Sequence, residues 1–352
     1  MKKKLSLLSI IMCTLMIILS GCGQKIKLST AILNNGKINS YSYDFNVTMN
    51  IPNDPKKIGN STSENFINTE NASFNLKGDL KKDEESQKIN GNVKISSEGA
   101  AIEAPIFINI YNKGKDFDFF VGIPGILKKS LGEVLANADS FYLSSKDLDE
   151  LMKKTLSQED YTKYNDTRNN NADNKIGEQV GIDIISVFNQ YKDKKKLEKF
   201  EAIDKKDTSK NGIVTLTLNK DDVKNIVSEY LGNEKYFNNF KALIQSSNSF
   251  NEIKDSQNDI SKLSSKEMIE KFNKSIDELK NMSISFKFTI EEEYVTKTNT
   301  IIEIEDTQGK GTININSSIS NINGVKEITI PDKNADKMIN VINLLESFGY
   351  SQ

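Results

Sequence analysis

Apolar and polar residues alternate strictly in many short segments of this chain, and this alternation limits the possible fold more than any other feature. From Tyr41 to Ile51 every second side chain is apolar, and Pro52 ends the run. A period of two indicates a β-strand with one buried face. The same pattern recurs at residues 74–80, 89–95, 106–110, 117–123, 213–218, 284–290, 294–305, 313–319 and 325–330. We therefore expect an α+β protein built on an antiparallel sheet.

Turn signals and helical periodicity indicate what connects the strands. The sequence Asn112-Lys113-Gly114-Lys115 separates two alternating runs and is typical of a hairpin turn. The Asn-rich stretch 164–175 has no period and is interpreted as a polar loop. The region around 124–280 is therefore predicted to be a helical, Asn-rich insertion in the sheet. Apolar residues three or four positions apart predict helices at 25–37, 127–135, 147–156, 182–191, 221–231, 264–279 and 335–345.

The N-terminus has the pattern of an export signal. Residues 2–4 are lysines, and an apolar run of about 15 residues follows, which is short for a membrane span of about 20. The next segment, Leu19-Ser20-Gly21-Cys22, resembles a bacterial lipobox, which implies cleavage between Gly21 and Cys22 and a diacylglycerol on Cys22. An ordinary signal peptide or an uncleaved anchor is the alternative. We expect a signal peptide at 1–21, a lipidated cysteine with a short tether at 22–26, and a folded domain at 27–352.

Composition excludes several classes of chemistry. The chain has no histidine and no tryptophan, and its two cysteines are Cys13, inside the predicted signal peptide, and Cys22. Ser-His-Asp and Cys-His catalysis, disulfides and most transition-metal sites are therefore excluded from the mature chain. We expect no catalytic residues, no metal and no cofactor. A hydrolase that uses two carboxylates stays open, although no pattern singles out a pair.

Charge argues against nucleic acid as a partner. The net charge of −2 becomes −5 when the three lysines of the signal peptide are removed. Arg168 is the only arginine, whereas phosphate recognition favours the guanidinium group. Abundant Lys, Asn and Ile with so little Arg indicate an AT-rich genome.

Four polar motifs suggest binding sites, but each has a simpler structural interpretation. The acidic runs 83–85 and 291–293 lack the spacing of a calcium loop and are typical of solvated turns. The sequence Gly309-Lys310-Gly311 lacks the other glycines of a phosphate loop, so a hairpin turn is expected. The basic run 192–196 has acidic neighbours and is interpreted as a solvated helix face.

The order of elements resembles the LolA/LppX-like superfamily of envelope proteins that handle lipids. The resemblance rests on the segment 37–51, which follows a short helix, and on the final alternating run 325–330 before Pro331. It implies a strongly curved antiparallel sheet, a half-barrel, with helices on its concave side and a cavity for a hydrophobic ligand. The Asn-rich middle departs from a compact version of that fold, so a two-lobed arrangement stays open. Candidate cavity residues are Tyr41, Tyr43, Phe45, Phe117 and Phe119, with ordinary core packing as the alternative.

These observations lead to one main functional expectation and its competitors. The first is a lipoprotein anchored on the extracytoplasmic face of a Gram-positive cell membrane, which binds or carries a lipid or other hydrophobic ligand and is not an enzyme. The second is a ligand-free surface lipoprotein that acts as an interaction or accessory module. A binding protein of an ABC importer is disfavoured because alternating strand-helix units are missing. The pattern does not identify the ligand, a protein partner or the oligomeric state.

Overall fold

The computed structural model describes residues 28–51, 71–97, 100–130, 137–169, 172–203, 211–248, 262–307, 309–335 and 337–347. The predicted signal peptide, the tether and Cys22 lie outside these residues. The chain divides into two units. Unit 1 comprises residues up to 37 together with 171–314, and unit 2 comprises residues 38–170 together with 315–352. The division passes through strand β11 (Lys310–Ser320).

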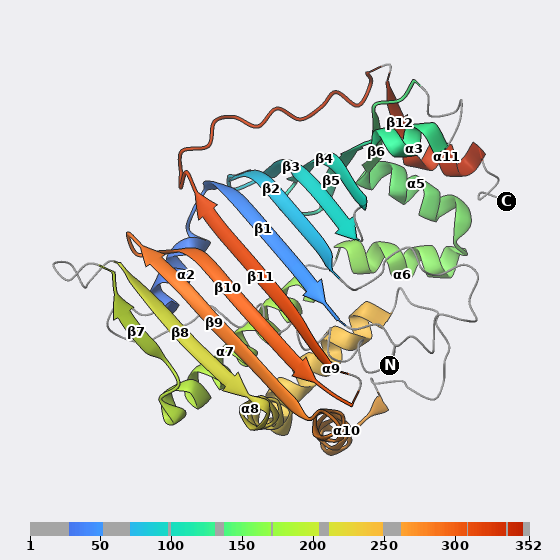
Figure 1. The fold of residues 1–352 in the computed structure, drawn as a ribbon. Coiled ribbons are helices and arrows are strands. Elements are labelled where there is room, and N and C mark those ends of the chain that lie inside the picture. The colour runs from blue at the N-terminus through green and yellow to red at the C-terminus, as the bar shows by residue number, and fades with distance from the viewer. Residues whose placement is uncertain are drawn as a thin grey trace. The chain divides into compact units, whose positions relative to one another are not determined.

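Unit 1 combines antiparallel strands with a cluster of helices. From the shared strand β11 its strands follow the order β11-β10-β9-β8-β7. Its helix α8 contacts strands β8 and β9 and also helices α7, α9 and α10, while α2 contacts β9 and β10 (Figure 1). The elements are α2 (Leu28–Gly36), α7 (Ala172–Lys195), β7 (Lys199–Ala202), β8 (Gly212–Asn219), α8 (Lys220–Gly232), α9 (Glu234–Asn248), α10 (Ser265–Asp277), β9 (Asn281–Glu291) and β10 (Tyr294–Glu305).

The core of unit 1 follows directly from the alternation of its strands. Val214, Leu216 and Leu218 of β8 are fully buried, while the residues between them are more exposed. In register they lie opposite Phe288, Phe286 and Ile284 of β9, which are also buried. One face of these strands is thus covered, and each buried branched or aromatic side chain contributes about 1.5–3 kcal/mol to stability.

Unit 2 is a longer succession of strands. They follow the order β1-β2-β3-β4-β5-β6-β12, in which each neighbouring pair is antiparallel except β6 and β12. The elements are β1 (Ser40–Asn50), β2 (Ala72–Lys82), β3 (Gln87–Ser97), β4 (Ala100–Tyr111), β5 (Asp116–Gly122), α3 (Gly125–Ser130), β6 (Ser140–Ser144), α5 (Ser145–Thr155), α6 (Gln158–Asn169), β12 (Met338–Asn340) and α11 (Val341–Ser347) (Figure 1).

The α+β class with mostly antiparallel strands is confirmed. Among the described residues β7 and β12 each pair with one strand only, so the strand order is open at both ends. The hairpin predicted at residues 112–115 joins β4 to β5, and Asn112, Lys113 and Gly114 have positive φ there. The region 124–280 contains helices, as predicted, but it also supplies β6 and β8, which pair with β5 and β9.

The prediction of a polar loop at 164–175 is wrong. Helix α6 continues to Asn169, and α7 begins at Ala172. The hydroxyl of Ser157 caps α6, because it accepts a hydrogen bond from the backbone N–H of Asp160 at 3.2 Å. A helix without a buried face leaves no period in the sequence, and α6 is mostly polar around its circumference.

Two predictions near the C-terminus are also wrong. Residues 325–330 form no strand, although they alternate, and among them only Ile328 is buried. The last helix begins at Val341 and not near Ala335, because Met338, Ile339 and Asn340 pair in parallel with β6. The side-chain oxygen of Asn340 then accepts a hydrogen bond from the N–H of Ile342 at 2.8 Å, which starts the helix at that point.

Candidate functional site

Strands β1–β5 of unit 2 carry a continuous apolar face. Directly paired residues of neighbouring strands lie on the same face of a sheet, so the register identifies its members. One row contains Tyr41, Leu80, Ile89, Ile108 and Phe119; the next contains Tyr43, Gly78, Gly91, Ile106 and Val121; a third contains Phe45, Leu76, Val93 and Ala104. We call the side chains of these three rows the apolar face.

The five aromatic residues predicted from the sequence separate into two groups on this side of the sheet. Tyr41, Tyr43 and Phe45 lie along β1, where the rings of Tyr41 and Tyr43 are 6.5 Å apart in an edge arrangement. Phe117 and Phe119 lie along β5, four strand spacings or about 19 Å away. They therefore share one side of the sheet without forming a single cluster.

The apolar face is incompletely covered. All five aromatic side chains are half-buried, whereas the equivalent positions of β9 in unit 1 are fully buried. Beyond the third row, the directly paired Ile95 and Ile102 are 43% and 42% exposed. Neighbouring apolar side chains that remain this exposed to solvent are typical of a surface that binds an apolar partner.

Tyr43 crosses the centre of this face. Its hydroxyl donates a hydrogen bond to the carbonyl oxygen of Asn90 at 2.9 Å, which brings this hydroxyl close to Gly91. A Cβ atom at Gly91 would lie 2.7 Å from that hydroxyl. Burial, and secondarily the charge of Asp79, raise the pKa of Tyr43 to about 12, so the phenol stays protonated and acts as a donor.

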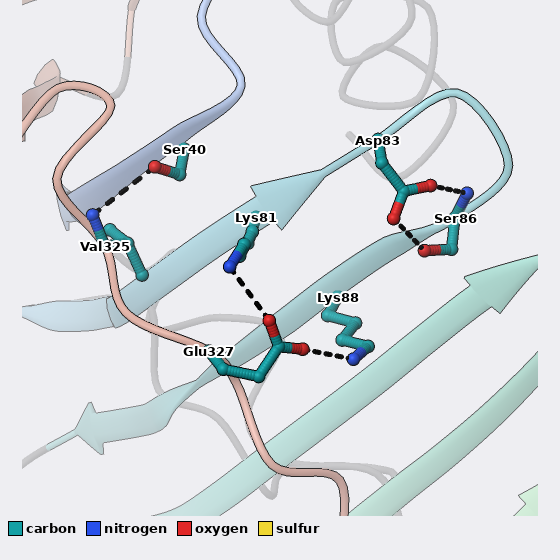
Figure 2. A network of polar contacts seen from close by, with 7 residues as sticks. All are labelled: Ser40, Lys81, Asp83, Ser86, Lys88, Val325 and Glu327. Carbon is teal, nitrogen blue, oxygen red and sulfur yellow. Dashed lines mark hydrogen bonds and ion pairs between the residues drawn. The ribbon is translucent and has the colours of Figure 1, made fainter.

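The opposite face of strands β1–β3 is polar and charged, whereas on β4 and β5 it also carries the paired Phe107 and Phe120. Ser42 donates to Asp79 at 2.6 Å, and Lys77 lies 3.9 Å from Asp44. Further along, Lys81 of β2 and Lys88 of β3 both donate to the carboxylate of Glu327, the first at 2.8 Å (Figure 2). Sequence reasoning missed this last group because Glu327 lies more than 200 residues from the two lysines.

Glu327 belongs to the segment 321–331, here called the strap, which follows β11. The strap is fixed near its start by Ser40, whose carbonyl accepts from the N–H of Asn323 at 2.7 Å and whose hydroxyl accepts from the N–H of Val325 at 3.3 Å. Figure 2 shows this second contact beside the Glu327 group. Hydrogen bonds from Lys81 and Lys88 lower the pKa of Glu327 to about 2.

Of the acidic runs, 83–85 forms a local turn. One carboxylate oxygen of Asp83 accepts from the N–H groups of Glu85 and Ser86, and the other accepts from the Ser86 hydroxyl. These bonds lower the pKa of Asp83. In the run 291–293, Glu291 accepts from the hydroxyl of Thr296 at 2.8 Å. Among the described residues no group of three or more His, Cys, Asp or Glu side chains is placed to hold a metal ion.

The remaining two motifs are structural. Asp306 and Gly309 exchange hydrogen bonds across the β10–β11 turn, in agreement with the predicted hairpin. In the basic run, Lys192 is buried and paired with Glu198, so the prediction of a fully solvated face is wrong at that residue. In the described part of the chain no helix is long and apolar enough to cross a bilayer.

Unit 1 contains buried carboxylates that the sequence did not single out. Asp183 accepts from the amides of Gln179 and Asn239 at 2.8 and 2.7 Å. Asp222 accepts from the hydroxyl of Tyr191 at 2.8 Å and caps its own helix. Each carboxylate is satisfied by donors from a neighbouring helix, which indicates a role in helix packing.

Comparison of the chain with protein-family models, with curated protein sequences and with solved structures finds no match. Gly21 and Cys22 lie outside the described residues. The functional conclusions below therefore depend on the sequence pattern and on the arrangement of the side chains.

Proposed function

We propose that this protein is a lipoprotein, anchored through Cys22 to the extracytoplasmic face of the cell membrane, that binds a lipid or another hydrophobic ligand on the apolar face of unit 2. The observation that carries the proposal is the set of three in-register rows across β1–β5, whose aromatic members are only half-buried. An extended sheet face of this kind matches a long, flexible apolar molecule better than a compact polar one.

The energy of such binding is sufficient for a carrier. Burying an acyl chain of about 16 methylenes at about 0.8 kcal/mol each gives an upper bound of about 13 kcal/mol. The costs of association reduce this value. Binding would also cover Tyr41 and Phe45, so that these half-buried side chains become fully buried.

The LolA/LppX-like resemblance belongs to the same proposal. A strongly curved half-barrel, with helices on its concave side, would enclose the apolar face and form the ligand cavity. The open strand order and the mostly antiparallel pairing support this arrangement. The missing strand at 325–330, which was one of the two segments behind the resemblance, weakens it.

Solvent extraction tests ligand binding directly. The chain from Gly23 onward is purified, extracted with organic solvent and analysed by mass spectrometry, and we expect a stoichiometric lipid or other apolar molecule. Val93→Asp places a charge on the apolar face and should abolish the ligand, whereas Asn92→Asp, its neighbour on the opposite face, should retain it. A clean extract from folded protein, repeated after incubation with membrane lipids, would contradict the proposal and favour the ligand-free accessory module.

Anchoring is tested independently in a bacterial host that processes lipoproteins. We expect Cys22→Ser to move the protein out of the membrane fraction and to abolish incorporation of a labelled fatty acid. Cys13→Ser, which lies in the predicted signal peptide, is the matched control and should retain both. Membrane retention and labelling of the Cys22→Ser variant would refute lipidation at this residue.

A further inference from the structure

Lys81 and Lys88 are direct partners in the β2–β3 pair and lie on the polar face. Like charges opposite one another destabilise a sheet unless an anion neutralises them. Other lysines of this face have an acidic partner from a neighbouring strand, since Lys77 lies near Asp44 and Lys94 is paired with Glu103. For Lys81 and Lys88 the anion comes instead from the strap.

Glu327 is held as a tethered group and not as part of a strand. The strap forms no ladder at 325–330, and its N-terminal part is fixed by Ser40. The carboxylate receives both ammonium groups, one on each oxygen, while the Glu327 side chain remains 61% exposed (Figure 2). Lysine is also a common ligand of phosphate groups, to which it presents a point charge.

We propose that Lys81 and Lys88 form a binding site for a phosphate group, and that the carboxylate of Glu327 occupies this site as an internal competitor. Exposed ion pairs of this type contribute little to stability, so an external dianion can displace the carboxylate. The neighbours of the two lysines along their strands, Leu80 and Ile89, point to the apolar face, so this site is separate from the proposed ligand site and does not depend on it.

Removing the competitor tests the site. Glu327→Gln keeps the shape of the side chain and removes its charge, and inorganic phosphate is then titrated at constant ionic strength with lysine side-chain NMR as the readout. Because a tethered group competes at an effective concentration on the order of millimolar, we expect phosphate to bind the variant at least about tenfold more tightly than the unmodified chain. Adding Lys81→Ala or Lys88→Ala to Glu327→Gln should abolish binding.

Lys77→Ala in the Glu327→Gln background is the matched control, because Lys77 lies on the same face near a different acid. Comparing Lys77→Ala with Lys81→Ala and Lys88→Ala in this background distinguishes a defined phosphate site from general attraction of phosphate to lysines. Equal phosphate affinity of Glu327→Gln and the unmodified chain, or equal losses from Lys77→Ala and Lys81→Ala, would overturn the proposal. If Glu327→Gln does not fold, the unmodified chain is titrated, and phosphate but not chloride must shift the signals of Lys81 and Lys88.

Vesicles distinguish the source of the phosphate group. Glu327→Gln is sedimented with vesicles of phosphatidylglycerol or of phosphatidylcholine, with and without free phosphate. Binding to the anionic vesicles that free phosphate reverses assigns the site to a lipid headgroup. Binding of free phosphate without vesicle binding assigns it to a soluble phosphate compound.

Discussion

Tyr43 and Gly91 depend on one another across the sheet. The hydroxyl of Tyr43 can reach Asn90 because Gly91 has no side chain. A Cβ at Gly91 would lie 2.7 Å from this hydroxyl and 2.7 Å from the carbonyl oxygen of Lys77. Gly78, its partner in β2, is even more crowded, since a Cβ there would lie 1.9 Å from the carbonyl oxygen of Asn90. The two paired glycines allow the strands to approach closely at the centre of the apolar face.

We expect Gly91→Ala to destabilise the protein by about 1–3 kcal/mol, the usual cost of overpacking. Gly125→Ala is the matched control, because a Cβ there meets nothing within 4 Å and the residue begins helix α3. Urea unfolding followed by circular dichroism measures both, since the chain has no tryptophan. Equal stability of the two variants would show that position 91 is not crowded by the Tyr43 hydroxyl and the Lys77 carbonyl oxygen.

The raised pKa of Tyr43 predicts a loss of stability at high pH. Its folded value of about 12 lies above the unfolded value of about 10. Its contribution is therefore complete below pH 10 and is lost as the pH rises towards 12. The stability advantage of the unmodified chain over Tyr43→Phe should shrink across this interval in urea unfolding experiments. A constant advantage from pH 8 to 12 would contradict the assignment.

At the scale of elements, three helices in the described part of the chain begin with a capping box: α5 at Ser144 and Asp147, α8 at Asn219 and Asp222, and α10 at Ser264 and Glu267. The last has the common form Ser-x-x-Glu. In α8 the boxed Asp222 also accepts from Tyr191 of α7, so this cap joins two helices. The cap thus contributes to packing as well as to helix initiation.

We expect Asn219→Ala to cost about 1 kcal/mol, the usual value for a lost N-cap. Asp222→Ala should cost more, about 1.5–3 kcal/mol, because it also removes the charged acceptor of the Tyr191 hydroxyl. Asp221→Ala, at an exposed position of the same turn, should cost less than either. Thermal unfolding of the three variants gives the order, and an Asp222→Ala effect no larger than that of Asp221→Ala would exclude the helix-joining role.

The elements that could be predicted are those with one buried face. Alternation located β1–β5 and β8–β10 because each strand presents one side to apolar neighbours. It failed at 325–330, since alternation reports an extended chain and not a hydrogen-bonding partner. It also failed for the parallel pairing of β12, whose three residues are too few for a period.

The candidate site was predictable to the same extent. The period placed Tyr41, Tyr43 and Phe45 on one face, and the register then aligned them with other strands. The glycines at 78 and 91, at apolar positions of alternating runs, were the available signal for the crossing by Tyr43. The grouping of Lys81, Lys88 and Glu327 has no local signal, because it depends on contacts over 239 and 246 residues.

At the scale of the chain, the strap returns to strands formed near the other end of the sequence. Asn323 contacts Asn39 and Ser40, and Glu327 contacts Lys81 and Lys88. These contacts bind the C-terminal part of unit 2 to its N-terminal part through polar groups. Stability that depends on such groups must vary with pH.

Glu327 determines the direction of that variation. Its folded pKa of about 2 lies below its ordinary value of 4.5, so its contribution is present above pH 4.5 and is lost as the pH falls towards 2. The difference in unfolding free energy between the unmodified chain and Glu327→Gln should be constant above about pH 5 and vanish near pH 2. A difference that persists to pH 2 would rule out the ion pairs as its cause.

The parallel pairing of β12 with β6 also has a consequence for the order in which the strands can pair during folding. Ser140–Tyr142 must wait for Met338–Asn340, which follow about 200 residues later in the chain and therefore leave the ribosome or an export channel after them. Until then one edge of β6 has unpaired amide and carbonyl groups that can accept any extended segment. Strand β12, the last strand in the described part of the chain, must therefore compete for this edge with any extended segment that reaches it first.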